Sequence, residues 1–248
     1  KGHRDIPLCN FTAEIVEDIC RDDGAGEVRE YQLKARLYSG EPLPSVTVPA
    51  SRYNSMGWVP DAFGARALIT VGMTNQQHTA AAIQYLSSPL QRLIYTHTGW
   101  RQINGRWHFL HGAGAIAASG YVSGIEVDLG RGLLNYRLPD PQSGDTQEAI
   151  RASIELLGIA PDHIIWPLLA AVFRSVLAEW LPAELSVFIV GPTGTFKTFL
   201  AAVCTAYFGK GWTGSNTPAS WSSTPNALER MAFTAKDHVL LIDDFAPN

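Results

Sequence analysis

The chain has 248 residues, of which 46% are hydrophobic and 17% charged, and its formal net charge is −4. These values are typical of a folded protein with one large or two ordinary domains, and they exclude a disordered chain. The charge does not indicate nucleic-acid binding by electrostatics alone, and without a run of about 18 uncharged apolar residues we expect no membrane span. The three cysteines lack CxxC spacing, which favours neither a disulfide framework nor a zinc site and predicts a cytoplasmic location.

Residues 1–141 are predicted to form a mostly-β module of α+β type, because alternating apolar residues indicate several strands. The predicted strands lie at residues 28–40, 43–50, 92–100, 106–116 and 124–130, with one helix at 75–88. Asn104-Gly105 separates two of these strands, and this pair is preferred in tight two-residue turns. We therefore expect a β-hairpin centred on INGR, residues 103–106.

A change in composition at LPDPQSGD, residues 138–145, predicts a linker, because proline, glycine, serine and aspartate crowd together there. Residues 142–248 are expected to form a helical segment and the amino-terminal part of an α/β P-loop NTPase domain. The apolar run LSVFIV, residues 185–190, suits a buried parallel strand of such a domain.

Two helices are predicted between the linker and this strand. Asp145 is a candidate N-cap for the first helix, Glu148 would complete a capping box, and Gly158 would end the helix. The second helix is predicted to run from about Pro167 to Trp180, because proline is tolerated in a first turn.

The stretch GPTGTFKT, Gly191 to Thr198, lies between an apolar run and a helix-like segment, which is the context of a phosphate-binding loop. Gly191 would let the chain turn sharply, and Gly194 would let the backbone approach a phosphate. The backbone N–H groups of the loop would point at the anion, together with the positive end of the following helix.

The cofactors predicted for this loop are ATP and Mg²⁺. The residues expected to contact the nucleotide are Gly191, Thr193, Gly194, Thr195, Phe196, Lys197 and Thr198. Lys197 would reach the terminal phosphates, and the Thr198 hydroxyl would bind Mg²⁺. The helix KTFLAAVCTAYFG is expected to end at Gly209.

Phe196 departs from the pattern, because a strict P-loop has glycine before the lysine. If the backbone there requires a positive φ, a bulky residue costs about 1–2 kcal/mol. We expect the loop either to accept that strain or to adopt a slightly different shape.

A second motif, HVLLIDDFAPN, places two carboxylates after four apolar residues, Val239 to Ile242. A buried strand there would deliver Asp243 and Asp244 to its carboxyl end, where parallel α/β sheets bind ligands. Asp243 is predicted to hold Mg²⁺, and Asp244 to orient or deprotonate the attacking water. Lys197 and Asp244 are therefore the predicted catalytic residues.

Between the two motifs, Thr224 is a candidate N-cap with Pro225 at the first helical position, after a short strand at Trp221 and Ser222. A GTPase is disfavoured, because TAKDHV, residues 234–239, places lysine and aspartate side by side. The guanine-reading N-K-x-D signature has one residue between them.

Five blocks of the sequence are similar to a family of mobile-element proteins described as phage- or plasmid-type primase-helicases. The blocks are FTAEIVEDICRDD, YQLKARLYSGEPLPSVTVPASRY, YTHTGWRQINGRWHFLHGAGAI, VFIVGPTGTFKTFLAA and VLLIDDFAP. Proteins of this family carry a domain of unknown function fused to a P-loop ATPase. The resemblance runs across nearly the whole chain, and HTGW and LLIDDFAP are its most distinctive parts.

The resemblance implies an ATP-driven motor of AAA+ or related helicase type, assembled as a homo-oligomeric ring and acting on DNA during replication of the element. Lys197 and Thr198 then match the nucleotide and Mg²⁺ contacts, and Asp243 and Asp244 the metal-binding and water-activating pair. Asp244 stands where many such motors have glutamate. Because the chain begins at Lys1 and stops soon after the second motif, we expect a piece of a longer protein, with the sensor residue and arginine finger downstream.

Two other functions stay open. The degenerate loop is compatible with a non-hydrolysing scaffold that binds nucleotide only for assembly. It is also compatible with a P-loop ATPase that remodels protein in defence or transposition.

Glu126 and Asp128 share one face of a predicted strand, as metal-binding carboxylates of polymerase sites do, but the alternation favours a half-buried strand with a wet outer face. His97, His108 and His111 lie in or beside the predicted hairpin. His108 and His111 are separated by an odd number of positions, so a regular strand would point them to opposite faces, which disfavours a shared metal site.

Aromatic and basic residues alternate between residues 92 and 137. They are Arg92, Tyr95, Trp100, Arg101, Arg106, Trp107, Arg131 and Arg137. Such a set can grip single-stranded nucleic acid, but aromatic residues are also ordinary in strands, and we favour tryptophans that pack in a core.

Overall fold

The computed structural model describes residues 7–140, 144–182 and 185–245. These residues divide into two compact units, Lys1–Ile94 and Tyr95–Asn248. We describe each unit by itself. Pro141, Gln142 and Ser143 of the predicted linker lie outside the described residues.

The first unit is built on a sheet in which four strands have the order β3-β2-β1-β4. These strands are β1 (Phe11–Asp22), β2 (Glu27–Leu37), β3 (Val46–Pro49) and β4 (Leu90–Tyr95). β2 pairs antiparallel with both β1 and β3, and the β1–β2 register shifts between Ile15 and Glu17. The strands predicted at 28–40 and 43–50 are confirmed with shorter bounds, whereas β1 was not predicted.

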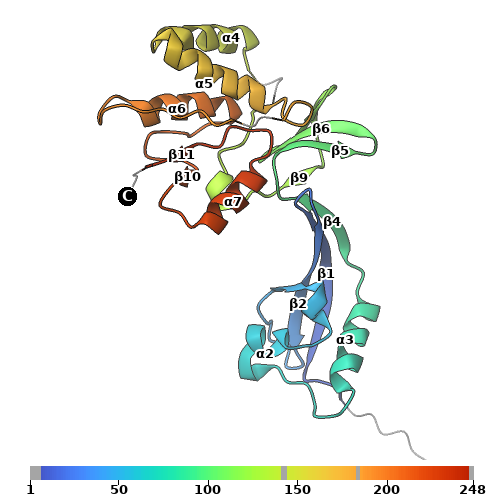
Figure 1. Ribbon diagram of the computed structural model, residues 1–248. Helices are drawn as coiled ribbons and strands as arrows, with labels where there is room; N and C mark the ends of the chain where they lie inside the picture. The colour runs from blue at the N-terminus through green and yellow to red at the C-terminus, as the bar shows by residue number, and fades with distance from the viewer. Residues whose placement is uncertain (1–6, 141–143, 183–184, 246–248) are drawn as a thin grey trace, which may run out of the picture. The chain divides into compact units, whose positions relative to one another are not determined.

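Helices cover this sheet and close the core of the first unit. They are α1 (Ala50–Tyr53), α2 (Trp58–Phe63), the 3₁₀ turn η1 (Gly64–Arg66) and α3 (Asn75–Leu86). α3 packs beside β1 (Figure 1), and the Tyr53 hydroxyl donates to the Ala80 carbonyl of α3 at 2.8 Å. The predicted helix at 75–88 is therefore confirmed.

The second unit begins with an antiparallel sheet in the order β5-β6-β7-β8. Its strands are β5 (Gly99–Ile103), β6 (Arg106–His111), β7 (Gly114–Ala117) and β8 (Gly120–Val122). Asn104 and Gly105 turn between β5 and β6 with φ values of 51° and 75°, as a hairpin turn of this type requires. The predicted hairpin is confirmed, but the expected strand 92–100 is broken between β4 and β5, and that at 124–130 shrinks to β9 (Glu126–Val127).

Two helices follow in this unit. In α4 (Thr146–Glu155) the Asp145 carboxylate accepts hydrogen bonds from the N–H groups of Gln147 and Glu148, so the predicted N-cap is confirmed. A 3₁₀ turn, η3 (Leu156–Gly158), ends it.

The boundaries predicted for the next helix were wrong. α5 (Asp162–Ser175) starts earlier and carries Pro167 inside it rather than in the first turn, and residues after Ser175 form turns. A proline removes one helical hydrogen bond. The buried side chains of Ile165 and Leu168, on either side of that position, hold the helix together.

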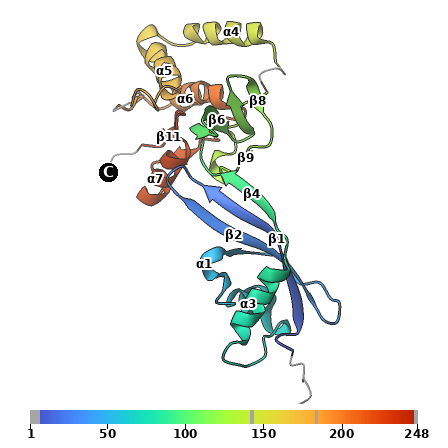
Figure 2. The same cartoon turned by 90° about the vertical axis from the view of Figure 1, so that its right-hand side faces the viewer.

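The last elements form a small three-layer arrangement. They are α6 (Lys197–Thr205), the 3₁₀ turn η4 (Ala206–Phe208), β10 (Ala219–Ser220), α7 (Pro225–Thr234) and β11 (Ile242–Asp243). β10 and β11 pair in parallel, and α6 lies on one side of them and α7 on the other (Figures 1 and 2). Thr224 caps α7 through the Ala227 N–H, with Pro225 at the first position, as predicted.

No strand forms at residues 185–190, where the sequence predicted a buried one. A strand needs a neighbouring backbone for its N–H and C=O groups. Among the described residues, this run pairs with no strand, and the side chains of Leu185, Phe188 and Val190 are exposed.

The unit boundary after Ile94 falls well before the expected boundary at residues 141/142. The segment before the linker packs with the elements after it: Tyr136 is fully buried against Phe208 and Trp212, and its hydroxyl donates to the Val239 carbonyl at 2.6 Å. Within the described residues, no helix is long and apolar enough to cross a membrane.

Candidate functional site

The predicted phosphate loop leads directly into α6. Residues 191–196 turn without helix or strand geometry, and α6 begins at Lys197. The free N–H groups of a helix start carry a partial positive charge, so this turn faces the end of α6 that attracts anions. Gly194 has a φ of 84°, which a glycine adopts without strain, and Thr193 beside it is exposed.

Lys197 folds back across the loop. Its ammonium group donates to the carbonyl oxygens of Gly191 at 2.9 Å and Pro192 at 2.7 Å. The Thr195 hydroxyl also donates to the Pro192 carbonyl, at 2.8 Å. The ammonium therefore lies at the mouth of the turn, where an anion held by the loop would take the place of these carbonyls as its partner.

Phe196 accepts the strain that its position imposes. It is the N-cap of α6 with a φ of 56° and a ψ of 23°, and its side chain is 78% exposed. The loop thus keeps the left-handed backbone that glycine would supply, at a cost of about 1–2 kcal/mol. Gly191 does not have a positive φ, so the sharp turn predicted at this glycine is not seen.

The two motifs meet at one hydrogen bond. The Thr198 hydroxyl, in the first turn of α6, donates to Oδ1 of Asp243 at the end of β11, with 3.0 Å between the oxygens. Both residues are half-buried. Residues 45 positions apart in sequence thus form one oxygen-lined corner beside Lys197.

Backbone pairing holds Asp243 in this place. Ser220 of β10 is its register partner, and the Trp221 N–H donates to the Asp243 carbonyl at 2.9 Å. The Phe245 ring, two residues on, packs edge-on against Trp221 and Phe188. The short strand predicted at Trp221 and Ser222 lies two residues earlier, at Ala219–Ser220, and only the end of the predicted strand 239–242 pairs.

Asp244 differs from Asp243. It is exposed, outside β11, and has a left-handed backbone with a φ of 58°. Its carboxylate has no contact in the structure that fixes a catalytic role.

The oxygen-lined corner suits Mg²⁺. This ion prefers oxygen ligands and is usually held by one or two protein groups together with substrate phosphates and water. The Thr198 hydroxyl and the Asp243 carboxylate offer such oxygens. Within the described ranges, this corner included, no group of three or more His, Cys, Asp or Glu side chains could hold a metal ion.

The HTGW motif clamps the segment that leads into β11, a contact that sequence reasoning missed. The Thr98 N–H donates to the Thr234 carbonyl at 2.8 Å, and its hydroxyl donates to the Lys236 carbonyl at 2.8 Å. The Trp100 N–H donates to Oδ2 of Asp237 at 2.8 Å. The Asp237 carboxylate is thereby a structural acceptor, although burial raises its pKa. Nothing in the sequence near either segment indicates that residues 98–100 contact residues 234–237, which lie more than 130 positions further on.

Of the other residues singled out from the sequence, Trp100 and the histidines pack inside the fold, whereas Glu126 and Asp128 are exposed. Trp100 packs on Phe109 and Trp180, and its indole N–H donates to the Val176 carbonyl at 2.8 Å. His108 and His111 are both buried, and their Nδ1 atoms lie against different backbone groups, the Arg106 carbonyl and the Ala113 N–H. Trp107 packs against Trp180 and is partly exposed.

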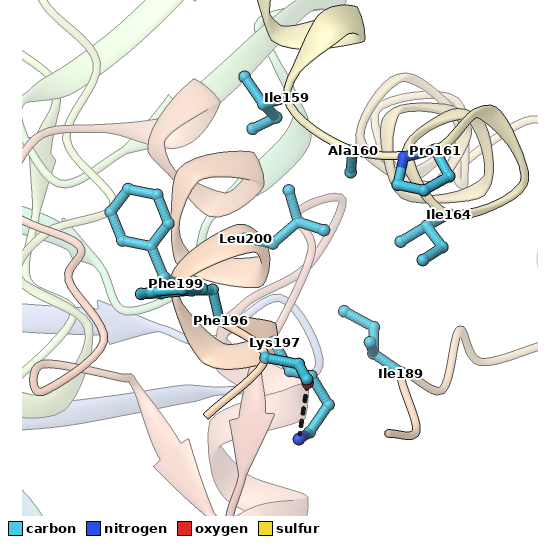
Figure 3. Close-up of a pocket in the computed structure, with 10 residues that line it drawn as sticks. Ile159, Ala160, Pro161, Ile164, Ile189, Phe196, Lys197, Phe199 and Leu200 are labelled. Atoms are coloured by element: carbon cyan, nitrogen blue, oxygen red, sulfur yellow. Dashed lines mark hydrogen bonds between the residues drawn. The ribbon is translucent and has the colours of Figure 1, made fainter. Parts of the chain in front are cut away.

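A cavity of about 370 Å³ lies beside the phosphate loop (Figure 3). Its walls come from the η3–α5 junction, from Ile189 and from the start of α6. None of the apolar wall residues before Gly191 was predicted from the sequence to contact a ligand. Thr195 and Lys197 of the loop also line it, so the loop and the cavity are continuous.

Comparison with protein-family models and with curated proteins found no match for this chain.

Proposed function

We propose that this chain binds a nucleoside triphosphate with Mg²⁺ at the loop 191–198, as the nucleotide-binding part of a P-loop ATPase. The observation that carries the proposal is the 3.0 Å hydrogen bond between Thr198, which follows Lys197 in the first turn of α6, and Asp243 at the end of β11. A glycine turn before a helix is common, but a hydroxyl and a strand-end carboxylate brought together next to it are the groups that such a site needs.

The chain's own residues would act as follows. The backbone N–H groups of the loop and the positive end of α6 hold the phosphates. The Lys197 ammonium leaves the carbonyls of Gly191 and Pro192 and neutralises the terminal phosphates. Thr198 and Asp243 hold Mg²⁺, which neutralises charge that develops on the phosphate oxygens.

The finer proposal is an ATP-dependent DNA motor of helicase type in a longer protein, acting as a homo-oligomeric ring. Its support is the resemblance of the loop, LLIDDFAP and HTGW to mobile-element primase-helicases. A P-loop ATPase that remodels protein has the same site and differs only in what it moves. A strand-displacement assay with and without ATP, on the full-length protein, separates them.

A non-hydrolysing scaffold is the second candidate, and the state of Asp244 favours it. This residue is one methylene shorter than the usual glutamate and lies on a left-handed backbone, so its reach to an attacking water is short. In the full-length protein, Asp244→Asn should abolish ATP turnover if Asp244 is the base. Turnover that is absent from both proteins while ATP still binds would favour the scaffold.

Binding itself is tested with Lys197→Ala. A hydrogen-bonded charge contributes about 1.5–3 kcal/mol, so we expect Mg·ATP affinity to fall about ten- to hundred-fold by calorimetry. Lys210→Ala removes the same charge from an exposed position after α6 and should leave affinity unchanged. Equal affinity of Lys197→Ala and the parent protein would contradict the proposal.

A further inference from the structure

We propose that the cavity beside the phosphate loop holds the nucleobase by apolar packing and does not read its hydrogen-bonding edge, so that ATP and GTP bind alike. This inference rests on the proposed function, because it assigns the phosphates to loop 191–198. It adds the class of nucleotide that the site accepts.

The position of the cavity indicates a base. Thr195 and Lys197 belong both to the loop and to the cavity lining, so a ligand whose phosphates lie on the loop extends directly into the cavity. The volume of about 370 Å³ is within the range of about 300–1,000 Å³ that small-molecule sites occupy. In Figure 3, Ile164 and Ile189 lie across the cavity from Leu200 and Lys197.

The walls are apolar. They are made by Ile159, Ala160, Pro161, Ile164, Ile189 and Leu200, together with Phe196 and Phe199. Among the described residues that line it, only Thr195 and Lys197 have side chains with a hydrogen-bonding group, and both of these already make hydrogen bonds within the loop. A flat, largely apolar ring fits such walls, whereas the amino and carbonyl groups that distinguish adenine from guanine find no side-chain partner.

Most backbone donors of the walls are also engaged. The Ile159 N–H donates to the Leu156 carbonyl at 3.2 Å, and the Ile164 N–H donates to the Pro161 carbonyl at 2.8 Å. The Leu200 N–H donates to the Phe196 carbonyl at 2.9 Å, and Pro161 has no N–H. A site discriminates strongly between similar ligands when the wrong ligand leaves buried polar groups unpaired. These walls offer few free polar groups that could discriminate in this way.

The specificity expected from packing alone follows size. Purines place more apolar surface in the cavity than pyrimidines, and burial of apolar surface is favourable. We therefore expect Mg·ATP and Mg·GTP to bind within about three-fold of each other, and CTP and UTP several-fold more weakly. Tripolyphosphate, which has no base, should bind weakest.

Ala160→Phe tests the cavity directly, because a phenyl group there fills the space between α5 and α6. Both Mg·ATP and Mg·GTP affinities should fall about ten-fold, while tripolyphosphate affinity stays unchanged. Ile154→Phe, at an exposed position of α4, is the matched control. If Ala160→Phe does not fold, as judged by circular dichroism, Ile164→Ala enlarges the cavity and should weaken both purine nucleotides equally.

The outcomes separate this inference from the proposed function. GTP binding more than about a hundred-fold weaker than ATP, or unchanged ATP affinity in a folded Ala160→Phe protein, would overturn the base cavity alone. Tripolyphosphate that binds as tightly as ATP would do the same, because only the loop would then be in use. If neither any nucleotide nor tripolyphosphate binds, the proposed function fails and the inference with it.

Discussion

Among the non-glycine residues of the second unit with a left-handed backbone, Asp237 and Phe196 differ in how that conformation is stabilised. Asp237 has a φ of 55°, and its half-buried carboxylate accepts the Trp100 N–H at 2.8 Å. Phe196 has a φ of 56°, and its ring is 78% exposed. The first strained residue is stabilised by a specific contact, whereas the ring of the second has little packing to stabilise it.

This difference separates a structural joint from a ligand site. The joint between residues 97–100 and 234–238 holds the chain that enters β11, and so fixes Asp243. The phosphate loop is exposed, and its lysine is bonded to loop carbonyls that an anion can replace. Strain without internal compensation often occurs where a ligand completes the structure, which is what we propose for the loop.

The largest effect should come from adding one methyl group to the joint. Gly99 has a φ of 88°, and a Cβ there would overlap the Asp237 carboxylate and approach the Lys236 carbonyl. Gly99→Ala should lower the free energy of unfolding by about 4 kcal/mol, from backbone strain and overpacking together. Urea denaturation measures this loss.

Gly105→Ala is the control for that substitution. Gly105 has a similar φ of 75°, but nothing lies within 4 Å of its added Cβ. It should cost only the backbone strain, about 1–2 kcal/mol. Equal losses in both proteins would show that the joint is not tightly packed.

The second largest effect should come from acid, which protonates the buried histidines His238 and His111. Burial lowers the pKa of His238 to about 4, despite its hydrogen bond to the Lys236 carbonyl, and burial with Arg137 nearby lowers that of His111 to about 4. Between pH 6.5 and about 4 the unfolded chain binds a proton at each histidine and the folded protein does not, so stability falls as the pH falls. Each shift corresponds to on the order of 3 kcal/mol.

Urea denaturation at a series of pH values measures this dependence. His238→Gln should flatten the slope in that window by about one proton, even if the variant is less stable overall. Asp237 acts in the opposite direction just above pH 3.8, because its raised pKa makes the folded protein bind more protons there. A slope that His238→Gln leaves unchanged would contradict the assignment.

The smallest effect on the free energy of unfolding is expected from substitutions of Phe196. Phe196→Gly removes the left-handed strain but adds flexibility to the unfolded chain, so we expect a gain in unfolding free energy of at most about 1 kcal/mol. Phe196→Ala removes the ring but keeps the Cβ, and should give no such gain. Thermal denaturation of the two variants separates strain in the backbone from exposure of the ring.

Features that depend on neighbouring residues could be predicted from the sequence. The Asn104-Gly105 turn, the Asp145 and Thr224 caps and the helix after the loop all form as expected, because their hydrogen bonds join residues a few positions apart. The sequence also predicted a turn before α6 and strain at Phe196 as one of two outcomes, and both are seen, whereas phosphate binding by this turn stays a prediction.

Features that need distant partners were decided only by the tertiary structure. The run 185–190 has the composition of a strand but pairs with no strand in the described part of the chain, and Pro167 lies within a helix held by buried side chains on both sides. The Thr198–Asp243 bond, the Trp100–Asp237 clamp and the cavity beside the loop each join segments far apart in the chain. Composition determines which segments can pair or pack, whereas the neighbour that satisfies their polar groups exists only once the chain has folded.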